Sequence, residues 1–230
     1  MIASLCWYPA TRPAWDRLWA DIRARLGWGP DRLSWPDEAG RHWRDPDLVL
    51  SMTCALPMRL GLAEDVTLIG SPIWDLPDVP PGHYVSHLVQ RADDRRSVEE
   101  ASAAGIAVNA LDSQSGWGCL RDAGLTGPIT ITGSHAASME AVARGEAHLA
   151  AIDAVTWAMA PHPALRIART TPPTPSTPFV TARPAWLLSV RSALDAAIAG
   201  MSAEDRAATK LIGIADLPGK PYAADLANTA

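Results

Sequence analysis

Between residues 84 and 160 the chain alternates regularly between short apolar strands and helical segments. The patterns predict strands at 84–91, 106–109, 129–132 and 149–152, and helices at 97–104, 116–123, 135–144 and 155–160. Strands that alternate with helices of about ten residues are typical of βαβ units on a parallel sheet. This rhythm constrains the chain to an α/β fold.

The segments on either side are expected to combine with each other. A strand is predicted at 2–8, followed by a helix at 11–26 with Thr11 as its N-cap. Apolar runs at 48–52 and 66–69 suit buried parallel strands, and helices at 185–199 and 203–209 have no sheet of their own. We therefore expect residues 1–84 with 182–230 to form lobe 1, and residues 85–181 to form an inserted lobe 2.

Two extended crossings, near 84–91 and 172–183, would join the lobes. Two α/β lobes with two crossings predict a ligand cleft that closes by hinge bending. Ligands of open α/β sheets bind beyond the carboxyl ends of the strands, so the turns that follow those strands are the places to search for a site.

Composition excludes several classes of partner. The 230 residues carry a formal net charge of −5, with a pI near 5.6, so no basic surface points to nucleic acid or to an acidic membrane. No apolar run reaches the roughly 20 residues of a membrane span. The first strand has no leader before it, which predicts a cytoplasmic protein, or a periplasmic one whose leader was removed.

Cysteine and histidine spacing gives no metal or cofactor site. Cys6, Cys54 and Cys119 lie far apart without a CxxC pair, and the six histidines contain no HxxxH pair. Met52, Cys54 and Met58 could form a soft-metal site, but buried sulfur in an apolar segment is the simpler interpretation. We expect no metal and no cofactor.

Three strand-to-helix turns carry polar side chains that could bind a ligand. The first holds Asp112, Ser113, Gln114, Ser115 and Gly116, where the helix N-terminus offers unpaired N–H groups and partial positive charge to a phosphate-like anion. The second holds Ser134 and His135, and the third holds Asp153, placed for a cation or an amine. Each polar residue could instead be only a helix cap.

Catalytic motifs are missing. The chain has no GxSxG elbow, no HExxH and no GxxxxGK loop. A triad of Ser113, His135 and Asp153 can be assembled on paper, but any chain with many serines permits that. We therefore expect a binding protein with no catalytic residue.

Four segments together resemble one known family. They are "YVSHLVQRADD", "IAVNALDSQSGWGCLR", "ITGSHAASMEAVARGEAHLAAIDAVTWAM" and "RTTPPTPSTPFVTARPAW". Over most of residues 84–186 the chain resembles the phosphate/phosphonate solute-binding proteins of ABC transporters (PhnD-like). The resemblance implies a two-lobed type 2 periplasmic-binding-protein fold that closes on phosphate, phosphite or an organophosphonate.

The resemblance also implies roles for individual residues. Ser113, Gln114 and Ser115 would hold the anion, His135 in the next turn with Ser134 would add a donor, and Asp153 could pair with the amine of an aminophosphonate. Tyr8 would contribute from the other lobe, and Trp117 stands where the family often has Tyr.

The chain also departs from the family pattern. Where the family commonly has Gly-Tyr-Pro-Tyr, this chain has Ala55-Leu56-Pro57-Met58. Leu56 and Met58 would make the opposite wall of the cleft more apolar, suiting a different organic group or weakening phosphonate binding.

Two other functions stay open at this stage. One is a cytoplasmic enzyme on the same scaffold that acts on a small carboxylate metabolite, similar to chorismate dehydratase. The other is a sensory domain that transmits lobe closure to a partner. The leading expectation is a solute-binding protein for a small oxyanion, with an ABC permease or a sensory protein as partner.

Overall fold

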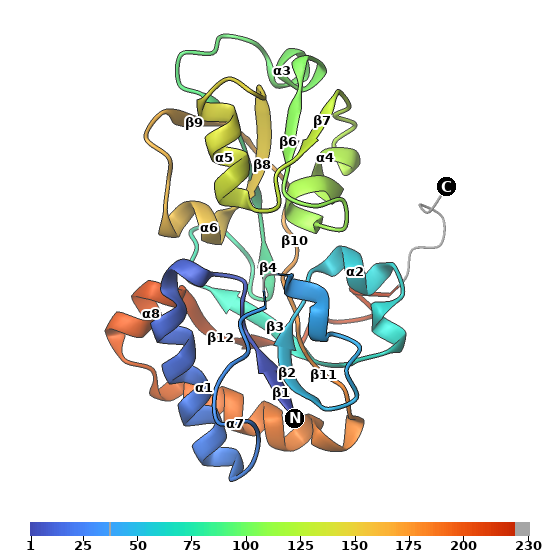
Figure 1. The fold of residues 1–230 in the computed structure, drawn as a ribbon, viewed down its shortest axis with the longest axis vertical. Coiled ribbons are helices and arrows are strands. Elements are labelled where there is room, and N and C mark those ends of the chain that lie inside the picture. The colour runs from blue at the N-terminus through green and yellow to red at the C-terminus, as the bar shows by residue number, and fades with distance from the viewer. Residues whose placement is uncertain (37, 224–230) are drawn as a thin grey trace. The chain divides into compact units, whose positions relative to one another are not determined.

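The computed structural model describes residues 1–36 and 38–223, which form two compact α/β units (Figure 1). Unit 1 comprises Met1–His83 and the described residues from Pro175 onward, and unit 2 comprises Tyr84–Thr174. The chain passes between the units through β4 (His83–Tyr84) and β10 (Thr174–Pro175), which pair with each other. Unit 2 is therefore an insertion in the chain of unit 1.

Unit 1 is built on a mixed five-stranded sheet. Its strands lie in the order β1 (Ile2–Ser4), β2 (Leu48–Met52), β11 (Phe179–Thr181), β3 (Thr67–Trp74) and β12 (Leu211–Ala215). β1 and β2 are parallel, whereas β11 runs antiparallel to β2 and β3, and β12 runs antiparallel to β3. The central strand thus comes from the part of the chain that follows unit 2.

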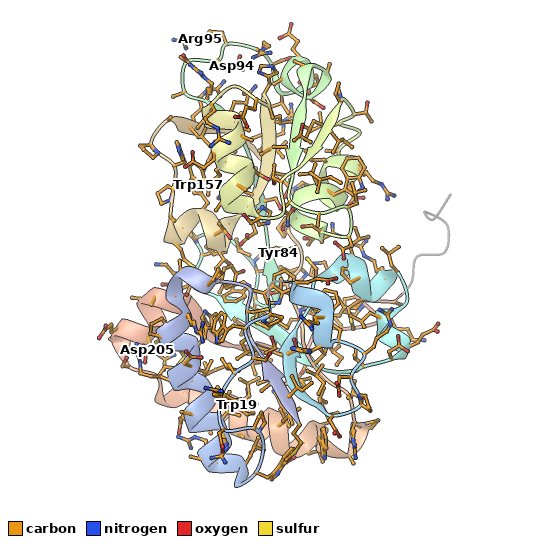
Figure 2. The ribbon with its side chains drawn as sticks, viewed as in Figure 1. Trp19, Tyr84, Asp94, Arg95, Trp157 and Asp205 are labelled. Atoms are coloured by element: carbon orange, nitrogen blue, oxygen red, sulfur yellow. The ribbon has the colours of Figure 1, made fainter. Side chains whose placement is uncertain are left out.

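Helices α1 (Arg12–Leu26), α7 (Leu187–Gly200) and α8 (Ala203–Thr209) pack together in unit 1 (Figure 1). α1 begins after Thr11, has Pro13 in its first turn, and ends at Gly27 in a left-handed conformation. Trp15 and Trp19 are fully buried, as their helical spacing predicts. Arg17 of α1 donates to Asp205 of α8, and Figure 2 labels Trp19 and Asp205 on these helices.

A second apolar cluster in unit 1 includes α2 (Ala55–Arg59). Met58 is buried there with Trp43, Leu48 and Tyr222. Met58 is therefore a core residue, and the expectation that it lines a ligand-facing wall is wrong, whereas Leu56 is only half-buried.

Unit 2 has a five-stranded sheet with helices on both faces. The order is β7 (Ile129–Ile131), β6 (Ile106–Val108), β8 (Leu149–Asp153), β5 (Ser86–Arg91) and β9 (Leu165–Thr170). β6 pairs in parallel with β7 and β8, and β5 is antiparallel to β8 and β9. The sheet is mixed because β5 and β9 run against the three parallel strands.

Alternating side chains of this sheet supply two separate cores. Ile106 and Val108 face a cluster with α3 (Val98–Ala104) and α4 (Cys119–Asp122), and Ala107 faces one with α5 (His135–Ala143). Strands covered on both faces read as continuous apolar runs, which is why they were visible in the sequence. A capping box starts α3, where Ser97 and Glu100 exchange hydrogen bonds.

Several predicted elements differ from the structure. The first strand ends at Ser4 instead of residue 8, and the helix expected at 116–123 is a π-helical turn, Gln114–Gly118, followed by the short α4. The closing helices do have a sheet partner, because β12 follows them and pairs with β3. β9 was also missed, since its alternation of apolar residues and arginines resembles a polar loop.

Candidate functional site

The three polar turns of unit 2 follow its three parallel strands. Because β6, β7 and β8 are parallel, their carboxyl ends lie at the same edge of the sheet. Backbone hydrogen bonds connect the turn after β7 to the end of β6. Thr132 N donates to Val108 O at 2.8 Å, and Gly133 N donates to Asn109 O at 3.0 Å. We call this edge the rim of unit 2.

The turn after β6 is stabilised by its own side chains. Ser113 is the N-cap, and its hydroxyl accepts from Gly116 N at 3.0 Å. The N–H groups of Trp117 and Gly118 both reach the Ser113 carbonyl, at 3.0 and 2.9 Å, which makes the turn π-helical. Ser115 is buried, with 4% of its surface exposed.

Gly116 is required by a close contact. An ideal Cβ on this residue would lie 1.7 Å from Asn109 Oδ1, so no side chain fits unless Asn109 moves. Asn109 directly follows β6, and its Oδ1 is buried and accepts no hydrogen bond from the described residues. Asn109 was missed as a site residue because it looked like the last position of an apolar strand.

A chain of polar contacts links the three turns. Nε2 of His135, in the turn after β7, lies 2.9 Å from Ser115 Oγ and 3.4 Å from Asp153 Oδ2. Asp153 caps α6 (Ala154–Met159) by accepting from Thr156 N at 2.8 Å, and its Oδ2 accepts from Thr156 Oγ1 at 2.5 Å. Ser115, His135 and Asp153 are thus brought together at the rim. Thr156, which the sequence analysis did not single out, holds the carboxylate of Asp153.

The direction of the hydrogen bond between Ser115 and His135 depends on the tautomer. The Ser115 hydroxyl accepts from Nε2 when that nitrogen carries the proton of neutral His135, and donates to Nε2 when Nδ1 carries it. Nδ1 of His135 is buried and has no hydrogen-bond partner among the described residues.

Both neighbours of His135 contact the same ring nitrogen. In a nucleophilic triad, the acid holds one imidazole nitrogen while the other takes the serine proton. The Ser115–His135–Asp153 arrangement lacks that geometry, and Ser113 points its oxygen at Gly116 N instead. The site therefore presents hydrogen-bond donors and no activated nucleophile.

Burial lowers the pKa of His135 below its ordinary value of 6.5, and the Asp153 carboxylate and the Ala151 backbone oppose this shift. Because the unfolded chain then binds a proton more readily, stability should fall as the pH drops from 7 through 6.5 towards the lowered pKa of His135. We expect the urea midpoint of the wild type to fall more between pH 7 and pH 5 than that of His135→Gln. An equal fall in both proteins would contradict this assignment.

The other predicted residues play smaller parts. Ser134 caps α5 by accepting from Ala137 N at 3.1 Å, and Trp117 packs partly against the α3/α4 core. The Gln114 amide lies beside Gly118 and donates to Asp122 at 3.4 Å.

Tyr8 belongs to unit 1 and lies in the turn after β1. Its ring stacks on Trp15 at 6.1 Å between centroids, and it meets Trp74 edge-on at 5.7 Å. Only 7% of Tyr8 is exposed, so most of this side chain is part of an aromatic core.

Neither a metal site nor a membrane span is found in the described part of the chain. No group of three or more His, Cys, Asp or Glu side chains there could hold a metal ion. No helix within 1–36 and 38–223 is long and apolar enough to cross a membrane.

Several solved structures share this fold at low sequence identity. The match with XAC2383 from Xanthomonas citri, bound to ATP, has a TM-score of 0.68 at 14% identity and covers 96% of this chain and 91% of that one. A binding protein component of an ABC phosphonate transporter (PA3383) from Pseudomonas aeruginosa gives 0.67 at 12%, covering 93% and 79%. PhnD1 from Prochlorococcus marinus, in complex with methylphosphonate, gives 0.64 at 15%, covering 93% and 89%.

The fold is therefore that of the type 2 periplasmic binding proteins, as the sequence predicted. The family model for the phosphonate periplasmic substrate-binding proteins of ABC transporters matches residues 77–218, and the chain belongs to this family. Its members bind substrates and are not enzymes, which excludes the enzyme alternative as the family function. A search of curated proteins found no match.

Proposed function

We propose that this protein binds a small oxyanion, most simply a phosphonate or a phosphate-like ligand, at the rim of unit 2. The observation that carries the proposal is the chain from Asp153 through His135 to Ser115. It leads from a buried carboxylate to a hydroxyl in a helix-entry turn, where backbone N–H groups favour an anion. Ser113 and Gln114 belong to the same turn.

Charge balance explains how an anion can bind beside a carboxylate. Neutral His135 leaves Asp153 as the one formal charge in the chain of three side chains. An incoming dianion stabilises the protonated imidazole, since an opposite charge nearby favours the charged form of a histidine. Binding should therefore favour uptake of a proton by the His135 imidazole.

The carboxylate of Asp153 is committed to orienting His135. Both of its oxygens accept from Thr156, and Oδ2 also faces Nε2. We therefore propose that the first role of Asp153 is to position His135. Its second role is to pair with the amine of a ligand, and tighter binding of an aminophosphonate would reveal it.

Known ligands of the similar structures support an anion. PhnD1 is bound to methylphosphonate, and XAC2383 is bound to ATP in one structure and to a chloride ion in another. All three are anions, although they differ greatly in size. Their negative charge supports an anion-binding site in this chain. The organic part of its ligand has to be determined by experiment.

The test is a thermal-shift panel of phosphate, phosphite, sulfate, methylphosphonate and 2-aminoethylphosphonate. A ligand at about 100 times its Kd stabilises the folded state by about 2.7 kcal/mol, a rise in Tm of roughly 5 to 10 °C. We expect at least one phosphorus oxyanion to produce this shift and sulfate to produce less. No shift with any compound at millimolar concentration would refute the proposal.

Membership of this family also suggests a partner protein and a cellular compartment. Its members deliver solute to ABC permeases from the periplasm, and we extend both to this chain as part of the proposal. The cytoplasmic location expected from the sequence stays a prediction, which fractionation of cells expressing the full-length protein would decide.

A further inference from the structure

Ser176 is a fully buried residue that directly follows β10, where the second crossing enters unit 1 (Figure 1). All of its polar groups make hydrogen bonds within unit 1. Ser176 N donates to Gly82 O at 2.9 Å, and Ser176 Oγ accepts from Trp74 Nε1 at 2.6 Å. Ser176 O accepts from the Tyr222 hydroxyl at 2.8 Å. The second crossing is therefore fixed to unit 1 at this one residue.

Gly82 has the matching position on the first crossing, because it directly precedes β4. The bond from Ser176 N to Gly82 O joins the two crossings where both belong to unit 1. An ideal Cβ on Gly82 would lie 2.8 Å from Leu217 Cδ2 and 3.0 Å from Ala215 Cβ. Leu217 belongs to the segment 216–223 after β12, which we call the C-terminal strap. The strap therefore packs directly on the first crossing.

The C-terminal strap also holds the second crossing, through Tyr222. This side chain is only 3% exposed, and its ring packs in the core of unit 1 with Trp43 and Val180. Its hydroxyl lies 2.6 Å from Ser71 Oγ as well as 2.8 Å from Ser176 O. The single hydroxyl proton of Tyr222 goes to the Ser176 carbonyl, so Ser71 donates the other bond.

These contacts matter because a two-lobed binding protein closes by bending at its crossings. The described chain passes between the units only at β4 and β10. A crossing that loosens on its unit 1 side adds conformations to the unliganded protein, and binding has to remove them. The apparent affinity then falls in proportion to the fraction of molecules in which the crossing is still anchored.

We propose that Tyr222 is a positioning residue for ligand binding, which acts by fixing Ser176 and thereby the unit 1 ends of both crossings. This inference rests on the proposed oxyanion function and adds to it a buried residue that acts without contacting the anion. Because coupling between two sites is reciprocal, a bound anion should in turn stabilise the anchor at Ser176.

Tyr222→Phe tests the proposal, since it removes the hydroxyl and keeps the ring in the core. Hydrogen exchange of the Ser176 amide, followed by NMR, should become at least about tenfold faster, the value of one lost hydrogen bond. Calorimetric titration with phosphate and methylphosphonate should give an affinity about three- to tenfold below that of the wild type, which corresponds to a loosened Ser176 in most unliganded molecules. In the wild type, a saturating concentration of the bound anion should slow exchange of the same amide.

Thr209→Val is the matched control, because it removes another buried hydroxyl of unit 1. Thr209 Oγ1 donates to Asp205 O at 2.8 Å within α8. This variant should lower the urea midpoint at least as much as Tyr222→Phe does, and it should bind both anions as the wild type does.

Three results would overturn the inference alone. They are wild-type affinity in Tyr222→Phe, an equal loss of affinity in Thr209→Val, and a Ser176 exchange rate in the wild type that a bound anion leaves unchanged. Wild-type protein that binds neither phosphate nor methylphosphonate would overturn the proposed function and this inference together.

Discussion

Gly116→Ala is expected to destabilise the protein by about 2 kcal/mol and to lower oxyanion affinity at least 100-fold. The new Cβ would lie 1.7 Å from Asn109 Oδ1, 2.9 Å from Asn109 Cγ and 3.2 Å from Ser113 Oγ. Overpacking of this kind typically costs 1–3 kcal/mol. Affinity falls further because the turn that carries Ser115 has to move. Urea unfolding and calorimetric titration measure the two effects.

Two companion variants sharpen this experiment. Gly200→Ala is a benign control, since its Cβ would meet its nearest neighbour, Arg25 Nη2, at an ordinary 3.5 Å. Asn109→Ala combined with Gly116→Ala removes the clash, so the double variant should recover part of the lost stability, a coupling that a double-mutant cycle measures. Additive losses would show that Asn109 is not what excludes the side chain.

His135→Leu is expected to weaken oxyanion binding roughly 10- to 150-fold, the value of a hydrogen bond to a charged group. His135→Gln places an amide nitrogen near the position of Nε2 and should keep affinity within about tenfold of the wild type. We expect this contrast because His135 Nε2 contacts both Ser115 and Asp153, and glutamine keeps a polar group there whereas leucine does not. Titrations with the same phosphonate compare the three proteins.

His162→Leu serves as the control for loss of a histidine. His162 precedes β9, and its Nε2 lies 3.4 Å from Glu140 Oε1. Its variant should bind as the wild type does. If His135→Leu also bound normally, the Ser115–His135–Asp153 chain would have no part in anion recognition.

The sequence was sufficient to predict the polar turns at the rim of unit 2, because local sequence signals determine where a strand ends and a helix begins. Strand ends, cap residues and short turns lie within a few positions of each other, so Ser113, Ser134 and Asp153 could be read as helix entries, and each is one. The hydrogen bond between Ser115 and His135 is different, since it depends on β6 and β7 being neighbours. Parallel pairing was expected, and it placed these side chains together.

Features set by distant contacts were harder to predict. β12 is short and partly exposed, and it becomes a strand only because β3 lies beside it. Met58 was assigned to a ligand-facing wall by analogy with a family motif, whereas packing against Trp43 and Tyr222 places it in the core. Asn109 has ordinary sequence surroundings, and only the unmet hydrogen bonding of its side chain marks it.

The position of β11 at the centre of the unit 1 sheet has a consequence for synthesis of the protein. β2 and β3 are made early, but they do not pair with each other, because β11 lies between them. On the ribosome, unit 2 is complete before β11 emerges, so it can fold while the sheet of unit 1 is still open. One edge of β2 and both edges of β3 are unpaired during this interval, because β12 is also made later. The nascent chain is therefore most vulnerable to aggregation before Phe179–Thr181 inserts.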